Sequence, residues 1–557
     1  MTEPAELALV NGAVYTVDAA RPWARAVAVR SGRIDVVGDD DDVRERIGPR
    51  TEVIDLGGRM LLPGFQDAHV HPPSSGVEML RCDLSQVSGA AAYERTVASY
   101  AAAHQDRDWI LGGGWAMGAF PGGNPPRATL DRIVPDRPVF LPSRDGHSAW
   151  VNGRALAIGG VTATTPDPED GVIVRGPDGE PWGTLHEGAM RLVEDHVPRE
   201  TTEEWIAGLR VGQAHLHALG ITAWQDAIVG IHTGYETLEA YRRFAADGSL
   251  TARVVGALWW DRYRGAEQLD ELREARERGR VGRFAATSVK IMQDGIDENF
   301  TAGMLEPYLG VDGAPTVNRG WSFIDPDELR SHVTALDRAG FQVHVHAIGD
   351  RGVREALDAF EAARAANGPN DLRHHIAHIQ VIHPRDLPRF RELSVVANGQ
   401  PLWAQNETQM LELTLPFLGP ERSAWQYPFG SLVRAGATLA FGSDWSVSSP
   451  NPLEEMHVAV NRTGFPSDDA RPESLTVPLL PEEAIDLATA IRAFTLGSAY
   501  VNHLDDVTGS IAPGKLADLV VLDRNVFEHP ASELYAARAQ LTLVEGERVF
   551  TADDFPS

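Results

Sequence analysis

Apolar and polar positions follow a repeating rhythm through the middle of the chain. Between about Leu61 and Asn502, amphipathic helical segments precede short apolar ones, as where residues 203–220 (EEWIAGLRVGQAHLHALG) lead into ITAWQDA. Residues 327–340 (DELRSHVTALDRAG) precede FQVHVHAIGD in the same way. Helix, glycine and strand in repeated succession are typical of a parallel sheet or barrel. The pattern therefore predicts an α/β protein with a (β/α)8 TIM barrel over residues 61–505.

This predicted barrel region is longer than the fold requires. A (β/α)8 barrel needs about 250 residues, so we expect an α/β insertion at about residues 78–195, where the rhythm is interrupted. The insertion contains an expected hairpin, GVIVRGPDGEPWGTLHE, that turns at Pro-Asp-Gly. Residues 1–60 and 506–557 consist of short β-rich runs with glycine turns, and we expect them to form the two halves of one small β-sandwich.

The charge balance bears on partners. The chain has 50 basic and 79 acidic residues, a net charge of −29 that is spread along its length. This distribution argues against nucleic acid or an anionic membrane as a partner and leaves a small-molecule substrate. A homodimer is compatible with the sequence, which does not specify the assembly.

Cysteine usage and the N-terminus bear on location. Cys82 is the only cysteine, so no intrachain disulfide can form. The first residues lack the basic and apolar regions of a signal peptide. No run approaches the roughly 18 to 20 apolar residues needed to cross a bilayer. We therefore expect a cytoplasmic protein.

Lysine is almost absent, which makes one of its positions informative. Only Lys290 and Lys515 are lysines, and arginine supplies the other basic residues. Lys290 stands inside the apolar segment SVKIMQDG, where a charged amine is costly unless it is neutralised or paired. Addition of CO2 would give a carbamate able to bridge two cations. A buried ion pair with a carboxylate such as Asp294 is the competing interpretation.

Histidines and an aspartate end several other predicted strands. His69 and His71 in PGFQDAHVHP are two apart, so on a strand they face the same side and can reach one ion. His346 and His378 follow apolar runs, and TLAFGS delivers Asp444 to the end of a strand, where barrel enzymes keep catalytic residues. Taken singly, each histidine is equally compatible with a structural hydrogen bond, and Asp444 with a helix cap.

The order of these residues, HxH, Lys, His, His and Asp, resembles the metal-ligand order of the amidohydrolase superfamily. The segments GGGW (112–115), DGHSAWVN (145–152), GTLHE (183–187), HAIGD, GSDW and GSIAPGKLADLVVLD resemble its amidohydrolase 3 branch, which includes N-substituted formamide deformylases. The resemblance covers essentially the whole chain. Ser446 after GSDW, and Met292-Gln293 after the lysine strand, depart from that branch and bear on substrate preference.

The resemblance implies a metal centre with two positions. His69, His71 and Asp444 would hold the more buried metal, and His346 and His378 would hold the outer metal. A carboxylated Lys290 would bridge the two metals. One or two Zn²⁺ ions are expected, with Mn²⁺ or Co²⁺ as alternatives. Such an ion lowers the pKa of bound water toward about 7, and Asp444 would act as general base.

The substrate and reaction are less determined. Residues expected around the substrate, the last two by orienting metal ligands, are Trp115, His147, Asn152, His344 and Asp294. Core packing explains Trp115 equally well. We expect hydrolysis of a C–N bond in an amide, N-substituted formamide or related carbonyl compound. A deaminase, esterase or decarboxylase on the same metal site is the alternative, and a non-catalytic scaffold of the same fold is the third candidate.

Overall fold

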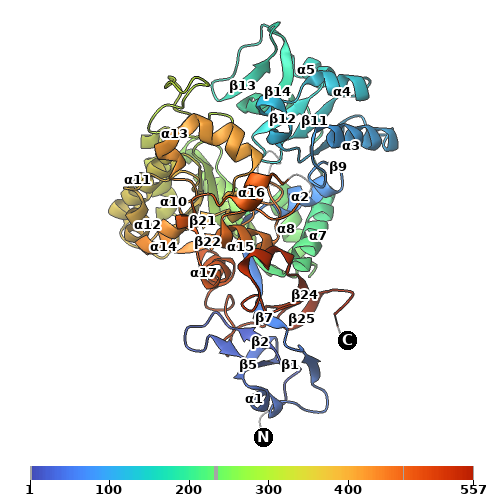
Figure 1. Ribbon diagram of the computed structural model, residues 1–557, viewed down its shortest axis with the longest axis vertical. Helices are drawn as coiled ribbons and strands as arrows, with labels where there is room; N and C mark the ends of the chain where they lie inside the picture. The colour runs from blue at the N-terminus through green and yellow to red at the C-terminus, as the bar shows by residue number, and fades with distance from the viewer. Residues whose placement is uncertain (1–2, 231–235, 468–469, 556–557) are drawn as a thin grey trace.

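A barrel of parallel strands forms the centre of the computed structural model, which describes residues 3–230, 236–467 and 470–555 (Figure 1). Eight strands are hydrogen-bonded in the order β22-β21-β20-β19-β18-β16-β15-β8. Their bounds are β8 (Phe65–Val70), β15 (Ile221–Val229), β16 (Arg253–Trp259), β18 (Phe284–Met292), β19 (Gln342–Ala347), β20 (His375–His378), β21 (Val396–Gly399) and β22 (Leu439–Phe441). The expected fold class is confirmed.

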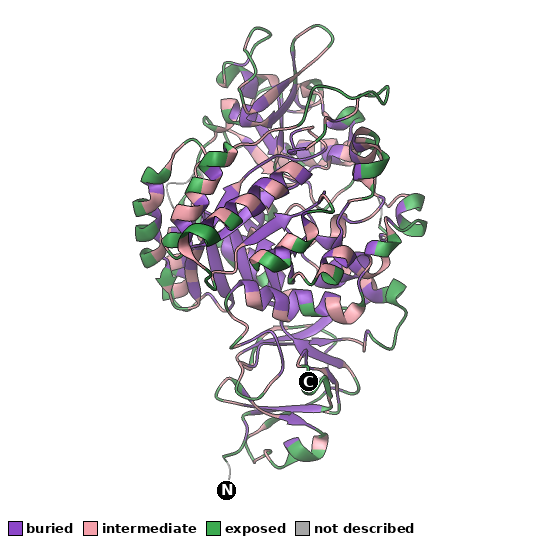
Figure 2. Cartoon of the chain, turned by 90° about the vertical axis from the view of Figure 1, so that its left-hand side faces the viewer, coloured by how far each residue is buried: buried purple, intermediate pink, exposed green. Residues whose placement is uncertain are grey.

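Burial explains why these strands read as continuous apolar runs. Every residue of β8, β19, β20 and β21 is buried, because helices cover the outer face of the barrel and side chains fill its interior. Figure 2 shows buried residues in the barrel strands and exposed residues on the outer faces of the surrounding helices. Those helices include α7 (Thr202–Ala218), α8 (Glu236–Ala246), α9 (Leu269–Arg278), α10 (Pro326–Arg338), α11 (Asp350–Asn367) and α15 (Pro452–Asn461).

Contacts between β8 and the segment around β22 bring the first and last strands of the barrel together. The Asp444 amide donates to the His69 carbonyl oxygen at 2.7 Å, and from the neighbouring strand β21 Asn398 Nδ2 donates to the Ala68 carbonyl oxygen at 2.9 Å. Residues far apart in the sequence therefore meet at the carboxyl ends of the strands.

The insertion forms its own sheet beside the barrel mouth. Its strand order is β13-β14-β12-β11-β10-β9, and it lies at the top of Figure 1 with α3 (Ala90–Ala103), α4 (Arg127–Ile133) and α5 (Gly153–Ile158). The expected hairpin is confirmed, because β13 (Gly171–Arg175) pairs antiparallel with β14 (Pro181–Glu187). The other strands are β9 (Cys82–Asp83), β10 (Ile110–Gly113), β11 (Val139–Pro142) and β12 (Ser148–Val151).

The chain ends contribute two further sheets at the opposite pole of the molecule (Figure 1). One has the order β25-β24-β23-β7-β2-β3 and combines both termini, from β2 (Ala13–Tyr15), β3 (Trp23–Ala24), β7 (Met60–Pro63), β23 (Leu519–Leu522), β24 (Ala539–Val544) and β25 (Glu547–Thr551). The other uses N-terminal residues alone, in β1 (Leu7–Val10), β4 (Ala26–Arg30), β5 (Arg33–Gly38) and β6 (Glu52–Asp55). Side chains of both sheets enclose one hydrophobic core. The domain limits at residues 60 and 505 stay a prediction.

No helix among the described residues is long and apolar enough to cross a membrane.

Two helices next to the site are in backbone contact. A Cβ atom on Gly76 of α2 (Pro72–Met79) would lie 1.9 Å from the Gly208 carbonyl oxygen of α7, and one on Gly208 would lie 2.5 Å from the Pro73 carbonyl oxygen. Helices approach this closely only where glycines leave room. The crossing fixes α2, which begins directly after His71.

We predict that Gly208→Ala lowers the free energy of unfolding by about 1–3 kcal/mol, the usual cost of overpacking a tight contact. Denaturant unfolding measures it. Ala207→Ser, on the exposed face of the same helix, serves as the control and should change stability by less than about 0.5 kcal/mol. Equal stability of Gly208→Ala and the wild type would contradict the close crossing.

Candidate metal centre and substrate cavity

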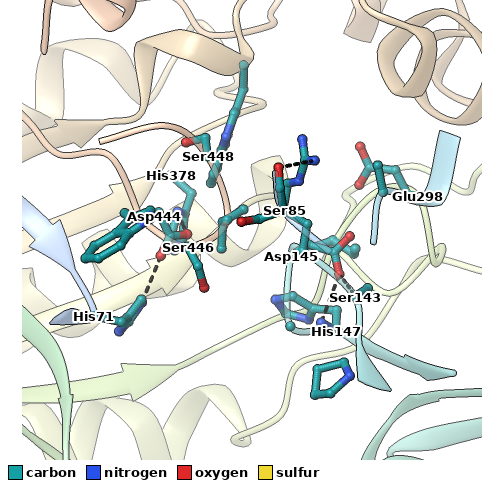
Figure 3. A pocket seen from close by; sticks show the side chains of 18 of the residues that line it. His71, Ser85, Ser143, Asp145, His147, Glu298, His378, Asp444, Ser446 and Ser448 are labelled. Atoms are coloured by element: carbon teal, nitrogen blue, oxygen red, sulfur yellow. Dashed lines mark hydrogen bonds and ion pairs between the residues drawn. The ribbon is translucent and has the colours of Figure 1, made fainter. Parts of the chain in front are cut away.

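A cavity of about 1720 Å³ opens at the carboxyl ends of the barrel strands and reaches residues of the insertion. All six residues expected to hold metal line this cavity, namely His69, His71, Lys290, His346, His378 and Asp444. Figure 3 shows His71, Asp444 and His378 together on one side, and Ser143, Asp145, His147 and Glu298 on the other.

Three side chains from the two ends of the barrel converge on one point. His69 belongs to β8, His71 follows that strand, and Asp444 lies just beyond β22. Asp444 Oδ1 is 3.2 Å from His69 Nε2 and 2.8 Å from His71 Nε2. Among the described residues, these three form the one group of three or more His, Cys, Asp or Glu side chains whose ligand atoms all lie within 4.8 Å of one another. They form a metal-site candidate.

The protonation states of this cluster suit a cation. Burial and the nearby Lys290 lower the pKa of His69 to about 3, so its imidazole is neutral. Burial alone would raise the pKa of Asp444, but the adjacent His69 and His71 hold that pKa well below its usual range. Neutral imidazoles and an ionised carboxylate are the forms that bind divalent metals. The buried His71 Nδ1 has no partner, which leaves this ring without the second-shell bond that metal-bound histidines usually make.

Asp67 holds the two halves of the cluster together. Its carboxylate accepts hydrogen bonds from the Ser443 amide at 3.1 Å, from Ser443 Oγ at 2.6 Å and from the His69 amide at 2.9 Å. Ser443 directly precedes Asp444, and His69 supplies both the amide and an imidazole of the metal-site candidate. Asp67 therefore fixes both sides of that candidate. Asp67 was not singled out by its sequence.

Lys290 is buried in the cavity floor without an acidic partner. Its side chain lies on β18 and is 2% exposed, and Nζ is 3.4 Å from His69 Nε2. Within the described chain no carboxylate, Asp294 included, is recorded in an ion pair with this nitrogen, and Asp444 is the carboxylate whose charge acts on it. Burial lowers the pKa of Lys290 to about 8, so a larger share of the amine is neutral than in water.

His346 and His378 form the neighbouring wall. Their rings pack edge to face with centroids 4.4 Å apart. His378 Nδ1 contacts Gln400 Oε1 at 3.0 Å, and His346 Nδ1 lies 3.2 Å from the Asp294 carboxylate. The contact with Gln400 occupies one nitrogen of the His378 ring and leaves the other for a ligand, whereas His346 Nδ1 makes no hydrogen bond to a described residue. Their role as metal ligands stays a prediction.

Comparison with known proteins identifies the family. The family model described as "Amidohydrolase family" matches residues 52–550. The chain belongs to the amidohydrolase family. The resemblance inferred from the motifs is confirmed.

Several members of the family match nearly the full chain. Protein LONG AFTER FAR-RED 3 of Arabidopsis thaliana is 33% identical over 98% of this chain and 92% of its own length. The N-substituted formamide deformylase of Arthrobacter pascens is 26% identical over 98% of both chains. A solved structure, an uncharacterized metal-dependent hydrolase from Pyrococcus furiosus, has a TM-score of 0.69 and 26% identity over 93% of this chain and 99% of that one. This chain is thus a metal-dependent hydrolase of the amidohydrolase superfamily with a metal-site candidate at His69, His71 and Asp444.

The insertion contributes a buried ion pair to the same cavity. His147 Nδ1 lies 2.9 Å from Glu187 Oε2, and Thr301 Oγ1 donates to Glu187 Oε1 at 2.8 Å. Burial would lower the pKa of His147, but the Glu187 carboxylate outweighs it and raises that pKa to about 9. The His147 ring lies 5.5 Å from the His346 ring, centroid to centroid. His147 therefore lines the cavity beside the metal-site candidate, as expected.

Three cavity residues have strained backbones. Glu187, His378 and Asp444 have φ angles of 51°, 77° and 56°. For residues other than glycine such conformations cost about 1–3 kcal/mol each and persist where the surrounding structure enforces them. They are typical of functional sites.

Trp115 and Asn152 do not line the cavity, which corrects the expectation that they are pocket walls. Trp115 is fully buried in the core of the insertion, and its indole N–H donates to the Leu141 carbonyl oxygen at 2.8 Å. Asn152 Oδ1 accepts from the amides of Val139 and Ala155, so that it caps α5. Both residues stabilise the insertion and are too buried to contact a substrate.

His344 and Asp294 also lie behind the cavity wall, and each contacts an expected ligand. His344 Nε2 is 2.9 Å from His69 Nδ1. Asp294 accepts hydrogen bonds from the amides of Gly303, Ile348 and Gly349 at 2.9–3.0 Å and lies beside His346. Their positions suit the orientation of ligands and not contact with the substrate.

Glu187 is a cavity residue that the sequence analysis does not predict. It is the last residue of the GTLHE segment and of strand β14. A carboxylate at the end of a predicted strand was the available signal, as it was for Asp444.

Proposed function

We propose that this amidohydrolase cleaves the C–N bond of an amide, an N-substituted formamide or a related carbonyl substrate. The observation that carries the proposal is the convergence of His69, His71 and Asp444 within 4.8 Å at the floor of a large cavity. The full-length similarity to the N-substituted formamide deformylase of Arthrobacter pascens supports this bond type.

The proposed metal ligands divide into two groups. His69, His71 and Asp444 would hold one ion, and a carboxylated Lys290 would bridge to a second ion held by His346 and His378. A bound Zn²⁺, or Mn²⁺ or Co²⁺, supplies a Lewis acid for the carbonyl and makes water acidic enough to react near neutral pH. This mixed set of imidazole and carboxylate ligands suits those borderline ions.

Asp444 performs the proton transfers in this proposal. Its carboxylate takes a proton from the attacking water as the new C–O bond forms. It returns that proton to the nitrogen as the C–N bond breaks, so the products are a carboxylic acid, or formic acid, and an amine. Asp67 and the hydrogen bond from the Asp444 amide to the His69 carbonyl oxygen keep the carboxylate beside the reacting atoms.

Substrate contacts come from the opposite wall. His147, held by Glu187, is the residue of the insertion that we expect to contact the substrate. Ser446 and Met292, where this chain departs from the related branch, both line the cavity and so bear on substrate preference. The single cysteine supports the expected cytoplasmic location, and a homodimer stays a prediction.

A turnover screen tests the reaction type. The zinc-loaded protein is assayed against N-formyl amines, N-acyl amino acids, ureas and lactams, with aryl esters, aminopurines and carboxylated aromatics as the competing classes. Turnover of an amide or formamide is expected. Turnover confined to esters, aminopurines or decarboxylation would replace the proposal with the corresponding alternative, and a chain that purifies without metal and turns over nothing would be a scaffold.

We predict that removal of metal by a chelator abolishes activity and that Zn²⁺ restores it, with Mn²⁺ or Co²⁺ as weaker substitutes. The reason is that a bound metal ion both polarises the carbonyl and activates water. Metal content per chain is measured alongside activity. Full activity after exhaustive metal removal would contradict the proposal.

Asp444→Asn is expected to lower turnover by about 10²- to 10⁴-fold, the usual contribution of a general base. Metal content should fall less, because the imidazoles remain. Asp337→Asn, at a buried aspartate that pairs with His374 outside the cavity, is the control for a lost carboxylate. Normal turnover by Asp444→Asn would assign proton transfer to another residue.

Lys290→Ala is expected to lose metal and activity by at least about tenfold, and acetate or propionate should partly restore both. A short carboxylate can occupy the space of the carbamate, whereas a missing cation would be replaced by a small amine. Lys515→Ala, at the other lysine, whose ammonium donates to the carbonyl oxygens of Asp505 and Thr508, is the control and should retain metal. Rescue by methylamine and not by acetate would end the carbamate interpretation.

A further inference from the structure

A line of polar side chains runs through the barrel interior and ends at His69. We propose that Gln342, Gln225 and His344 form a hydrogen-bond relay that fixes the tautomer of His69, so that its Nε2 lone pair faces the metal-site candidate. The inference rests on the proposed metal site and adds positioning residues to it. The direction of each hydrogen bond, from Gln342 to His69, supports the relay.

The relay is anchored by two backbone carbonyl groups. Gln342 Nε2 donates to the carbonyl oxygens of Arg373 at 3.0 Å and of Val501 at 2.6 Å. A carbonyl oxygen can only accept, so the amide nitrogen of Gln342 must face these two groups. Its Oε1 therefore points the other way, toward Gln225.

Gln225 passes this direction on. Its Nε2 donates to Gln342 Oε1 at 3.0 Å and to Asn502 Oδ1 at 3.0 Å. Both hydrogens of the amide nitrogen are thereby used. Gln225 Oε1 is left to face His344 Nδ1, from which it is separated by 2.7 Å.

The orientation of Gln225 determines which nitrogen of His344 carries the hydrogen. Because Gln225 Oε1 can only accept, the hydrogen of this contact belongs to His344 Nδ1. The ring is fully buried, and its two nitrogens contact Gln225 Oε1 and His69 Nδ1 instead of a carboxylate, so a neutral ring is the stable form. A neutral ring with hydrogen on Nδ1 has its lone pair on Nε2, which lies 2.9 Å from His69 Nδ1.

His69 then has one remaining option. Its Nδ1 carries hydrogen and donates to His344 Nε2, so its Nε2 bears the lone pair. That nitrogen lies 3.2 Å from Asp444 Oδ1 and 3.4 Å from Lys290 Nζ, within the metal-site candidate. In the other tautomer a hydrogen would occupy this position and block coordination. In the neutral ring, the relay thus selects the tautomer that can bind a metal, against the nearby Asp444 carboxylate, which would accept a hydrogen from Nε2.

The wild-type tautomers can be measured in the metal-free protein. Long-range ¹⁵N–¹H correlation spectra of histidine-labelled protein distinguish Nδ1–H from Nε2–H, and His344→Gln and His69→Asn variants assign the two signals. We expect Nδ1–H for both His344 and His69. Hydrogen on Nε2 of either ring, or an equal mixture of tautomers at His69, would overturn the relay.

A pair of substitutions of similar shape separates the relay from simple packing. His344→Gln leaves an amide oxygen able to accept from His69 Nδ1–H, whereas His344→Met fills the same space without an acceptor. We expect His344→Met to weaken Zn²⁺ binding about 10- to 100-fold, the usual effect of losing such a partner, and His344→Gln to stay within about threefold of the wild type. Equal Zn²⁺ affinity of the two variants would contradict the inference.

Gln342→Met tests the far end of the relay, where the residue contacts no expected ligand. It frees the Gln225 amide to reverse and should weaken Zn²⁺ binding by several-fold. Gln213→Met is the matched control, because Gln213 is also a buried amide that bonds to backbone groups, at Ser249 and Thr251, but lies outside the relay. Equal effects of the two would overturn the relay.

A wild type that binds no Zn²⁺ would overturn the proposed function, whereas the tautomer measurement would still decide the relay.

Discussion

The contact between the first and last strands of the barrel is the constraint on which the rest of the site depends. Asp67 on β8 accepts hydrogen bonds from the Ser443 amide and hydroxyl, and the Asp444 amide donates to the His69 carbonyl oxygen. Without this contact the HxH segment and Asp444, which are 373 residues apart, would not share one carboxylate oxygen. Closing the barrel is therefore also what assembles the metal-site candidate.

A barrel filled with polar groups must satisfy them, since each unpartnered buried donor or acceptor costs about 1–3 kcal/mol. Here the interior amides of Gln225 and Gln342 are satisfied by a chain of bonds that ends at His69. The same hydrogen bonds that stabilise the barrel interior also fix the tautomers of His344 and His69. One hydrogen-bond network therefore both stabilises the barrel interior and orients the site. The insertion adds the His147–Glu187 pair, which lies outside this network.

The sequence predicted the barrel, the insertion and the residues that line the cavity floor, because parallel strands deliver their terminal side chains to one mouth. Lys290 and Asp444 could be predicted because each is a polar residue within or directly after an apolar run. Trp115 and Asn152 were misplaced, because the side of the insertion that faces the barrel depends on packing between distant segments. The relay could not be predicted for the same reason. Gln225 and Gln342 are 117 residues apart, and only the folded structure shows that Gln225 donates a hydrogen bond to Gln342.

The central claim is that His69, His71 and Asp444 hold a catalytic metal. Anomalous diffraction from crystals of the zinc-loaded protein, recorded on both sides of the zinc absorption edge, tests it most directly. We expect a peak within about 2.0–2.2 Å of an imidazole nitrogen of His69, an imidazole nitrogen of His71 and a carboxylate oxygen of Asp444. A fully loaded, active crystal whose zinc peak lies away from these three side chains would contradict it.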